Sequence, residues 1–446
     1  MAVRGEGVYV WDADDHPYLD FSGSAAVNLI GHGVREIGDA MAEQARKLEF
    51  VHSSQFTTPV AEEFAAELLE FAGRHFAGGA VYFTSGGSES VETALKLARQ
   101  YQVEIGQKNR HQILSRQQSY HGSTLGALAV SGNRRRREIY LPMVRDFAHI
   151  GAPYCYRCEF DCTDGCRNCG QQYAAELERA IEAAKDQAAG FIFEPMSGAT
   201  LGAVTPPPGY LQAIADICRR HGVLLIADEV MTGVGRTGRN FAVEHFAFEH
   251  GSIARPDILV TAKGLSSGYA PLGAVIASKN VVDAIAAGSG AFLHGFTYNA
   301  HPVSVAAGRA VLRRIQELKL VQAADSGANG TAGSALKAAL ESLRELEAVG
   351  DVRGMGLLWA IEFVADKRTK NPFAPEKNFA ALVGKVCLRR GLLVYPMQGC
   401  VDGIAGDHLL IAPPAVISAE EIGWAVQQIR AAVVETSVAA RWSSAH

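Results

Sequence analysis

An acid and a lysine thirty-five residues apart offer the clearest chemistry in this sequence. Asp228 ends the apolar run VLLIA, and Lys263 follows the strand-like run Asp257–Thr261 between two small residues. A carboxylate buried at a strand end is costly unless it is paired, and the protonated nitrogen of a pyridine ring is such a partner. A buried lysine near a cation has a lowered pKa, so it can bond an aldehyde and then carry protons. The pair therefore indicates pyridoxal phosphate.

Both residues also have ordinary structural explanations. Asp228 could cap the start of a helix or form a buried ion pair with an arginine. Lys263 could be a solvated loop lysine, as most lysines are. We favour the cofactor because it would account for both residues together.

Two further features accompany this pair. Residues 84–88 (TSGGS) lie between a predicted strand and a predicted helix, where two glycines and a helix N-terminus suit a phosphate. No lysine follows, so this is not a Walker loop, and such a loop alone can simply turn the chain. Tyr120 follows the strand-like Gln112–Ser115; its flat ring could stack on a cofactor or only cap the core.

The elements that must position these residues alternate between short apolar runs and helical patterns. This alternation is typical of a mainly parallel sheet covered by helices on both faces, which binds ligands at the carboxyl ends of its strands. The expected elements are Val81–Thr84, Ser88–Tyr101, Gln112–Ser115, Gly190–Glu194, Leu211–His221, Val223–Asp228 and Asp257–Thr261.

A second, α+β lobe is expected after this region. Long helical runs begin at Val303 and Ser334, followed by strand-like Gly356–Val364 and Leu409–Ile411 and a final helix Ala419–Val434. Residues 5–21 alternate like a β-hairpin. We expect residues 1–50 to join the small lobe, residues 51–302 to form the large cofactor-binding domain, and residues 303–446 to form the small domain.

Composition limits the classes of function. The 446 residues are 48% hydrophobic, enough for two packed lobes, and a formal charge of −5 gives no general reason to bind nucleic acid. The run Arg134–Arg137 is interpreted as a solvated face or as partners of ion pairs. The N-terminus lacks the apolar core of a secretion signal and no long apolar segment occurs, so a cytoplasmic protein without a membrane anchor is expected.

Five of the eight cysteines lie between Cys155 and Cys169. They form two C-x2-C pairs with Cys162 between them. Four thiolates could hold a tetrahedral zinc ion, or the segment could carry reduced thiols on a surface excursion. The cysteines are not assigned to a metal.

The ordered motifs together resemble the class III pyridoxal-phosphate aminotransferases, the ω-aminotransferase group. The resemblance covers nearly the whole chain and rests on many segments rather than on one. The segments are VYVWDADDHPYLDFSGSAAVNLIGHG, YFTSGGSESVETALKLAR, SYHGSTLGAL, FIFEPMSGA, LLIADEVMTGVGRTG, AKGLSSGYAPLGA, HGFTYNAHPVSVAAGRAVL and VRGMGLLWAIEF.

The resemblance implies a fold-type-I transferase and a role for each matching residue. It implies that Lys263 bonds the cofactor aldehyde, Asp228 pairs with the ring nitrogen, and Glu194 lies near the substrate or its gate. Thr297 would reach the partner's phosphate across the interface of a homodimer. The other cofactor-binding residues implied are Gly87 and Ser88 at the phosphate, Tyr120 and His121 at one ring face, and Val230 at the opposite face.

Two departures from the family pattern bear on specificity. Met231 stands where many relatives have a glutamine that contacts the ring hydroxyl. Between Gly391 and Val434 the only arginine is Arg430, and GCVDGIAGD occupies the place of an arginine that often receives substrate carboxylates. The residue that would receive a keto acid is therefore not identified.

We expect an aminotransferase that works by two half-reactions. An amine, remote from or lacking an α-carboxylate, would displace Lys263 and give up its amino group, which an α-keto acid such as pyruvate or 2-oxoglutarate would then take up. A racemase or an aminomutase on the same scaffold is the alternative, since both would share Lys263 and Asp228. A regulator that binds the cofactor without turnover is less favoured, because no DNA-binding motif adjoins the domain.

Overall fold

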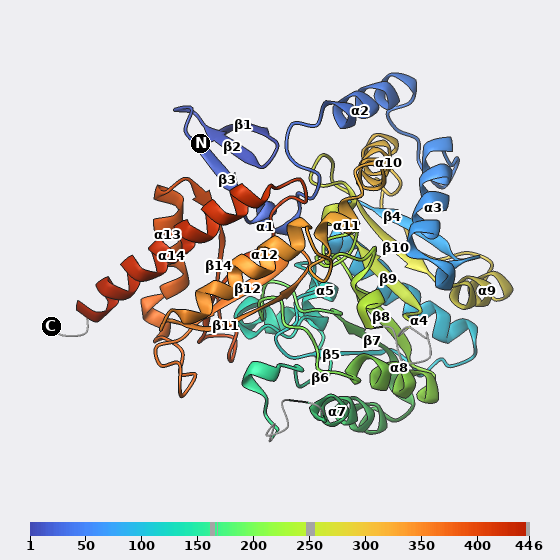
Figure 1. The fold of residues 1–446 in the computed structure, drawn as a ribbon. Coiled ribbons are helices and arrows are strands. Elements are labelled where there is room, and N and C mark those ends of the chain that lie inside the picture. Colours follow the sequence, from blue (N-terminus) through green and yellow to red (C-terminus); the bar gives the residue numbers. More distant parts are fainter. Residues whose placement is uncertain (161–165, 167, 247–254, 443–446) are drawn as a thin grey trace.

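The computed structural model describes residues 1–160, 166, 168–246 and 255–442. Figure 1 shows a large lobe built on one wide sheet and a smaller lobe formed mainly by the C-terminal third of the chain. Within the described residues, no helix is both long enough and apolar enough to cross a membrane.

The large sheet contains seven strands among the described residues, in the order β4-β10-β9-β8-β7-β5-β6. Only β10 runs antiparallel to its neighbours, so the sheet is mainly parallel, as predicted. Every residue of β7 to β10 is buried, which explains the continuous apolar runs in the sequence. The strands are β4 (Ala80–Thr84), β5 (Gln112–Arg116), β6 (His149–Ile150), β7 (Ala188–Phe193), β8 (Leu224–Asp228), β9 (Ile258–Thr261) and β10 (Gly273–Ala277).

Helices cover both faces of this sheet. In β8, Leu225 and Ala227 pack in one core and Ile226 packs in another, because successive side chains of a strand point to opposite faces. One face is covered by α4 (Gly87–Glu104), α5 (Leu125–Val130) and α9 (Lys279–Ala287). The other face is covered by α3 (Pro59–Ala72), α7 (Cys169–Ala183), α8 (Tyr210–His221) and α10 (Pro302–Glu317).

The smaller lobe is built on an antiparallel sheet in the order β11-β12-β15-β14. Its strands are β11 (Val349–Met355), β12 (Leu358–Phe363), β14 (Tyr395–Gln398) and β15 (Asp407–Ile411), and its helices are α12 (Ala332–Glu341), α13 (Phe379–Arg389) and α14 (Ala419–Trp442). The final helix was expected to end at Val434. It continues because no glycine or proline interrupts it, and residues 443–446 lie outside the described part.

The N-terminus forms three strands rather than the expected hairpin alone. They are β1 (Ala2–Glu6), β2 (Tyr9–Asp12) and β3 (Pro17–Asp20), and β3 pairs in parallel with β13 (Leu392–Leu393). Residues near the two ends of the sequence therefore share one sheet. The domain boundaries proposed from the sequence stay a prediction.

The remaining elements are short apart from one helix. That helix, α2 (Arg35–Lys47), packs against α10. The others are α1 (Gly23–Ala26), α6 (Arg134–Arg137), α11 (Leu320–Ala324) and the 3₁₀ turns η1 (Arg74–Phe76), η2 (Glu138–Met143), η3 (Cys155–Arg157), η4 (Lys185–Gln187), η5 (Ala242–Phe246), η6 (Lys263–Leu265), η7 (Ser342–Glu345) and η8 (Pro375–Lys377).

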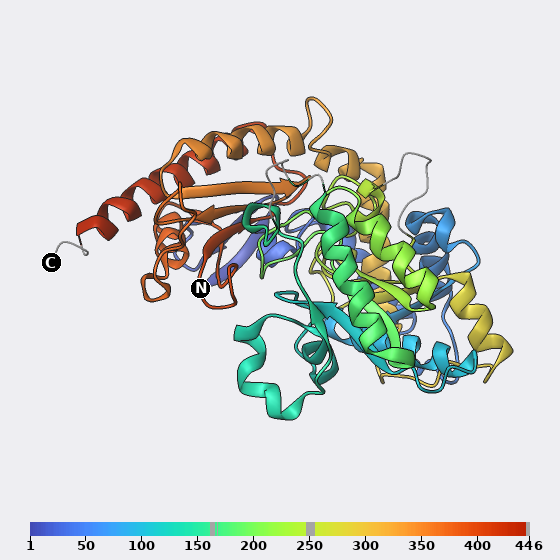
Figure 2. The same cartoon turned by 90° about the horizontal axis from the view of Figure 1, so that it is seen from below.

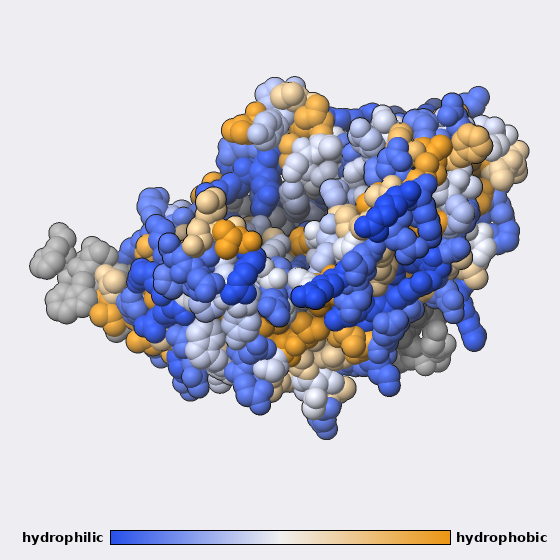
Figure 3. Space-filling view, turned by 90° about the horizontal axis from the view of Figure 1, so that it is seen from above, coloured by the Kyte–Doolittle hydropathy of each residue, from blue (hydrophilic) through white to orange (hydrophobic). Residues whose placement is uncertain are grey.

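One segment projects from the body of the molecule. Seen from below, α6 and η2 form the teal projection in Figure 2. Its side chains Ile139, Leu141 and Met143 are exposed, and the space-filling view from above shows apolar atoms at the tip of this projection (Figure 3).

Candidate active site

A cavity of about 470 Å³ lies at the carboxyl ends of the parallel strands. This is where an open α/β sheet binds its ligand. A larger groove of about 1050 Å³ runs beside α14 in the small lobe, but none of the residues singled out for chemistry lines it. The predicted residues that line the 470 Å³ cavity are Gly87, Ser88, Tyr120, His121, Glu194, Asp228, Val230 and Lys263.

Asp228, the last residue of β8, is held at both carboxylate oxygens. Its Oδ2 lies 2.7 Å from Nδ1 of His121, and its Oδ1 accepts the N–H of Val230 at 3.0 Å. Since a carboxylate only accepts, His121 carries its proton on Nδ1. His121 is buried, and its Nε2 has no hydrogen-bond partner among the described residues. The contact fixes the direction of the carboxylate and was not foreseen from the sequence.

Lys263 begins the turn η6, and one residue, Ala262, separates it from β9. Its backbone has a φ of 45°, in the left-handed region that costs a non-glycine residue about 1–2 kcal/mol. The pKa of the Lys263 amine is lowered to about 8, mainly by burial; the charges of Asp228 and Glu194 oppose this shift, and those of Arg136 and Arg236 add to it. An amine with this pKa is partly neutral near pH 7, as a nucleophile must be.

The glycine loop begins α4 at the cavity wall. The helix starts at Gly87, so its first backbone amides have no partners within the helix. A Cβ added to Gly87 would lie 3.0 Å from Cγ1 of Val230, so the loop and the residue after Asp228 approach closely. Ser88 Oγ accepts the N–H of Ser123 at 3.0 Å. The loop thus combines free amides with a hydroxyl, which suits a phosphate.

Tyr120 is half-buried at the cavity and carries an unexpected neighbour. Its hydroxyl lies 2.8 Å from Ser123 Oγ, and the guanidinium carbon of Arg136 lies 4.5 Å from its ring centroid. The arginine run was interpreted as solvated or ion-paired. Arg134 does pair with Glu138, and Arg135 donates to Gln398, but Arg136 stacks on an aromatic ring of the cavity.

Glu194 follows β7 and is almost fully buried. Its Oε1 accepts the N–H of Gly198 at 2.9 Å, whereas its Oε2 has no hydrogen-bond partner among the described residues. Burial raises the pKa of the Glu194 carboxyl. The group can therefore exchange a proton more readily near neutral pH than an exposed glutamate.

Three other sequence expectations concern the edges of the site. Thr297 is exposed and is not among the residues that line the cavity, so its role at a partner's phosphate stays a prediction. Met231 lines the cavity, so a thioether stands where many relatives would present a glutamine amide. Arg430 donates to Ser342 and pairs with Glu345, so it takes no part in the cavity lining.

The residues of the cavity fit pyridoxal phosphate because several of their polar groups have no hydrogen-bond partner within the described part of the chain. The orphaned Nε2 of His121 and Oε2 of Glu194, the partly neutral amine of Lys263 and the free amides of α4 all belong to one cavity. Buried polar atoms without partners are rare and call for a ligand or ordered water. An anionic, aromatic aldehyde would meet the donors at one end and the acid at the other.

A mainly parallel sheet with an acid after one strand and a lysine after the next defines this chain as a fold-type-I transferase. Residues 1–433 match the family described as aminotransferase class-III. The chain therefore belongs to the class-III aminotransferases, and it is an enzyme of that class.

Individual relatives agree with this assignment. The chain is 41% identical over 421 residues to the uncharacterized aminotransferase YodT of Bacillus subtilis, covering 94% of this chain and 91% of that protein. A thermostable (S)-enantioselective omega-transaminase from Thermomicrobium roseum has a TM-score of 0.89 at 38% identity, covering 98% and 92% of the two chains. The omega transaminase from Pseudomonas jessenii, solved in complex with PMP, has a TM-score of 0.89 at 30% identity, again covering 98% and 92%.

Proposed function

We propose that this aminotransferase binds pyridoxal phosphate and moves an amino group from an amine or ω-amino acid to an α-keto acid such as pyruvate or 2-oxoglutarate in two half-reactions. One observation carries the proposal: Lys263, with its pKa lowered to about 8, shares a cavity with Asp228, which His121 holds at 2.7 Å. A base and a fixed anion in one cavity are what a proton transfer at a carbon beside nitrogen requires.

The residues that would hold the cofactor follow from their positions. The amides at the start of α4 and the hydroxyl of Ser88 would take the phosphate, and Asp228 would take the ring nitrogen. Tyr120 and Val230 would lie against the ring. When bound, the protonated pyridine ring supplies an electron sink for a carbanion at the substrate.

The protein itself supplies the base and the orientation. The Lys263 amine would remove a proton at the substrate carbon and return it at a different atom, in each half-reaction. His121 would keep the Asp228 carboxylate pointing into the cavity, because its Nδ1–H occupies the Oδ2 atom. Glu194 would keep its free oxygen for the substrate or for a water molecule.

Arg136 is proposed to receive the carboxylate of the keto acid. The segment 399–407, which stands where the gate arginine was expected, contains no lysine or arginine, and Arg430 is engaged elsewhere. Arg136 stacks on Tyr120 at the cavity, and within the described residues its guanidinium pairs with no carboxylate. Arg136 is not among the residues that line the cavity, but it contacts the lining residue Tyr120 and its charge acts on Lys263. An unpaired guanidinium at this place suits a bidentate carboxylate.

A homodimer is the proposed active unit. The exposed Thr297 lies next to exposed apolar side chains at Leu293 and Tyr298, and the projection carries Ile139 and Met143. Exposed apolar side chains on each of these two segments are typical of surfaces that another chain covers. Together they support a second copy of the chain as the source of one more phosphate contact.

The test is the visible absorption spectrum of the purified protein with cofactor. We expect a yellow band that a panel of amines bleaches and that a keto acid restores, and that Lys263→Ala lacks. A band that amines shift without lasting bleaching would favour a racemase or aminomutase. No band after addition of cofactor would refute cofactor binding, and glutamate as the fastest donor would refute the proposed donor class.

A further inference from the structure

The cysteine-rich segment between β6 and α7 brings three thiols together. The Sγ atoms of Cys155, Cys166 and Cys169 all lie within 4.8 Å of one another. Cys166 and Cys169 are buried at 7% and 2% exposure, so the cluster faces inward rather than toward solvent. Cys162 lies outside the described residues. The sequence alone left open whether these thiols converge, and the fold now brings them together.

We propose that this segment binds a structural zinc ion through Cys155, Cys158, Cys166 and Cys169. A tetrahedral zinc with Zn–S bonds of about 2.3 Å places its sulfurs about 3.8 Å apart, which the three clustered atoms can reach with small shifts. Cys158 is not one of these three, so its side chain would turn toward them to complete the tetrahedron. Each C-x2-C pair has the spacing found in structural zinc sites, although the loop between the two pairs, residues 159–165, is shorter than is usual.

The surroundings of the thiols set the geometry of the cluster, in which Cys166 Sγ lies 3.8 Å from the carbonyl of Cys155 and Cys169 Sγ lies 3.3 Å from that of Cys166. Cys158 ends the turn η3, and its N–H donates to the carbonyl of Cys155 at 3.3 Å, so the first pair is set in one tight turn. The hydroxyl of Tyr173 donates to Cys158 Sγ at 3.7 Å, as donors around metal-bound sulfur commonly do. Cys169 is the first residue of the fifteen-residue helix α7, so the second pair is set at a helix start.

A cation explains the cluster better than the alternatives. A disulfide would join two sulfurs and leave the third crowded beside it. Zinc would replace the thiol protons, because the ion binds cysteine as the thiolate. Zinc is the ion that four thiolates in a tetrahedron select, without redox chemistry of its own.

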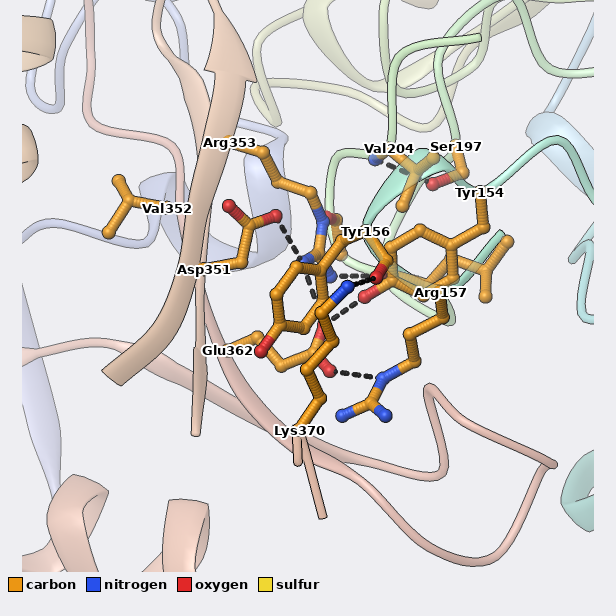
Figure 4. Close-up of polar contacts among 12 residues, drawn as sticks. Tyr154, Tyr156, Arg157, Ser197, Val204, Asp351, Val352, Arg353, Glu362 and Lys370 are labelled. Carbon is orange, nitrogen blue, oxygen red and sulfur yellow. Dashed lines mark hydrogen bonds and ion pairs between the residues drawn. The ribbon is translucent and has the colours of Figure 1, made fainter. Parts of the chain in front are cut away.

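The proposed zinc site would stabilise a contact between the two lobes. Figure 4 shows Tyr154, Arg157 and Arg353 meeting at Glu362 of β12 in the small lobe. Arg157 and Arg353 each donate to this carboxylate at 2.7 Å, and Tyr154 donates to it as well. Tyr154 and Arg157 flank Cys155 in the chain, so a metal at the cysteines would fix the residues that reach Glu362.

The same contact reaches the candidate active site. Arg353 donates from Nη2 to the carbonyl of Leu201 and from Nε to that of Gly202, both at 2.6 Å. These residues follow Gly198 and Ala199, which line the cavity. The metal would therefore brace one wall of the site from outside, without touching the reacting atoms.

The first experiment is the metal content of the holoenzyme purified under reducing conditions, by inductively coupled plasma mass spectrometry. We expect about one zinc ion per chain. Cys155→Ser and Cys169→Ser should each lose most of it, whereas Cys218→Ser, which removes a buried thiol from α8, should keep it. The proposal is overturned if the protein contains no zinc and takes up none from zinc chloride, or if the cluster variants keep their metal.

A second measurement uses the unaltered protein, so that misfolding of a variant does not decide the outcome. Titration with p-mercuribenzoate in the presence of a zinc-sensitive dye should release the metal as about four thiols react. Reaction of the clustered thiols without release of zinc would overturn the proposal. Because the readout is metal and not turnover, it is independent of the proposed amine transfer.

Discussion

The guanidinium carbon of Arg136 lies 4.5 Å from the ring centroid of Tyr120, and the charge of Arg136 helps to lower the pKa of Lys263. One arginine is thus coupled to the aromatic wall of the cavity and to its lysine. Arg135, its neighbour, instead donates to Gln398 in the small lobe. The two adjacent arginines give a matched pair of variants for testing how the site receives a carboxylate.

Arg136→Leu should weaken the reaction with the keto acid and spare the reaction with the amine. A charge-assisted hydrogen bond contributes about 1.5–3 kcal/mol, so we expect KM for pyruvate to rise about 10- to 100-fold. Stopped-flow spectra measure the two half-reactions separately.

Arg135→Leu is the control for this change, because it removes the same charge from the same helix. It should leave both half-reactions within about twofold of the unaltered protein. Equal losses in the two variants would mean that the arginine run acts only through its overall charge. An unchanged keto-acid reaction in Arg136→Leu would assign the carboxylate to another group.

Asp228→Asn should slow the amine half-reaction while the cofactor stays bound. The amide keeps the shape of the side chain but removes the negative charge, and the loss of one fixed electrostatic partner costs about 10²–10³ in rate. His121→Asn should cost less, because His121 acts by positioning Asp228 at 2.7 Å. The double variant should lose less than the product of the two effects, since both act through one contact. Independent, fully multiplicative losses in single-turnover experiments would contradict this coupling.

The parts of the site that the sequence predicted stand at fixed places relative to strands. Asp228 ends β8, Lys263 follows β9 and Gly87 follows β4, so recognising the buried strands placed them at one sheet edge. Arg136 could not be chosen in this way, because four consecutive arginines on a short projecting turn carry no periodic signal for the one that stacks on Tyr120.

Ion pairs between the two lobes could not be predicted from the sequence either. Glu362 stands inside the apolar strand LWAIEF, a pattern that signals a buried and therefore paired charge. Its partner Arg157 lies 205 residues earlier in the chain, beyond the reach of local reasoning. Which cation pairs with a buried acid depends on how the lobes pack and not on spacing.

Covalent uptake of the cofactor should depend on pH through Lys263. Burial lowers the pKa of this amine to about 8, and only its neutral form attacks an aldehyde. The rate of uptake by the cofactor-free protein should therefore rise with pH and level off above about pH 8. With an unperturbed lysine, whose pKa is about 10.4, the rate would still increase above that pH. Absorbance at the yellow band reports the covalent step. Quenching of the fluorescence of the Lys263→Ala variant reports noncovalent binding alone. A rate that continued to rise steeply to pH 10 would show that Lys263 is not perturbed.

Glu362→Gln should destabilise the protein through the contact between the lobes. Burial alone would raise the pKa of Glu362, but Arg353 and Arg157 outweigh it and hold that pKa below its usual value. Replacing the carboxylate leaves these two cations without their shared anion, and breaking such a buried pair costs about 3–5 kcal/mol.

The loss should appear in urea unfolding at pH 7, and its pH dependence follows from the sign of the shift. A lowered carboxyl pKa contributes stability above the unfolded value of 4.5, and that contribution disappears as the pH falls through the lower folded value. The difference between Glu362→Gln and the unaltered protein should therefore be largest near neutrality and shrink below pH 4.5. Glu376→Gln is the control, because Glu376 is exposed in η8 and forms no ion pair within the described residues, and it should change the stability by less than about 0.5 kcal/mol. Equal stability of the two variants at pH 7 would show that Glu362 does not hold the lobes together.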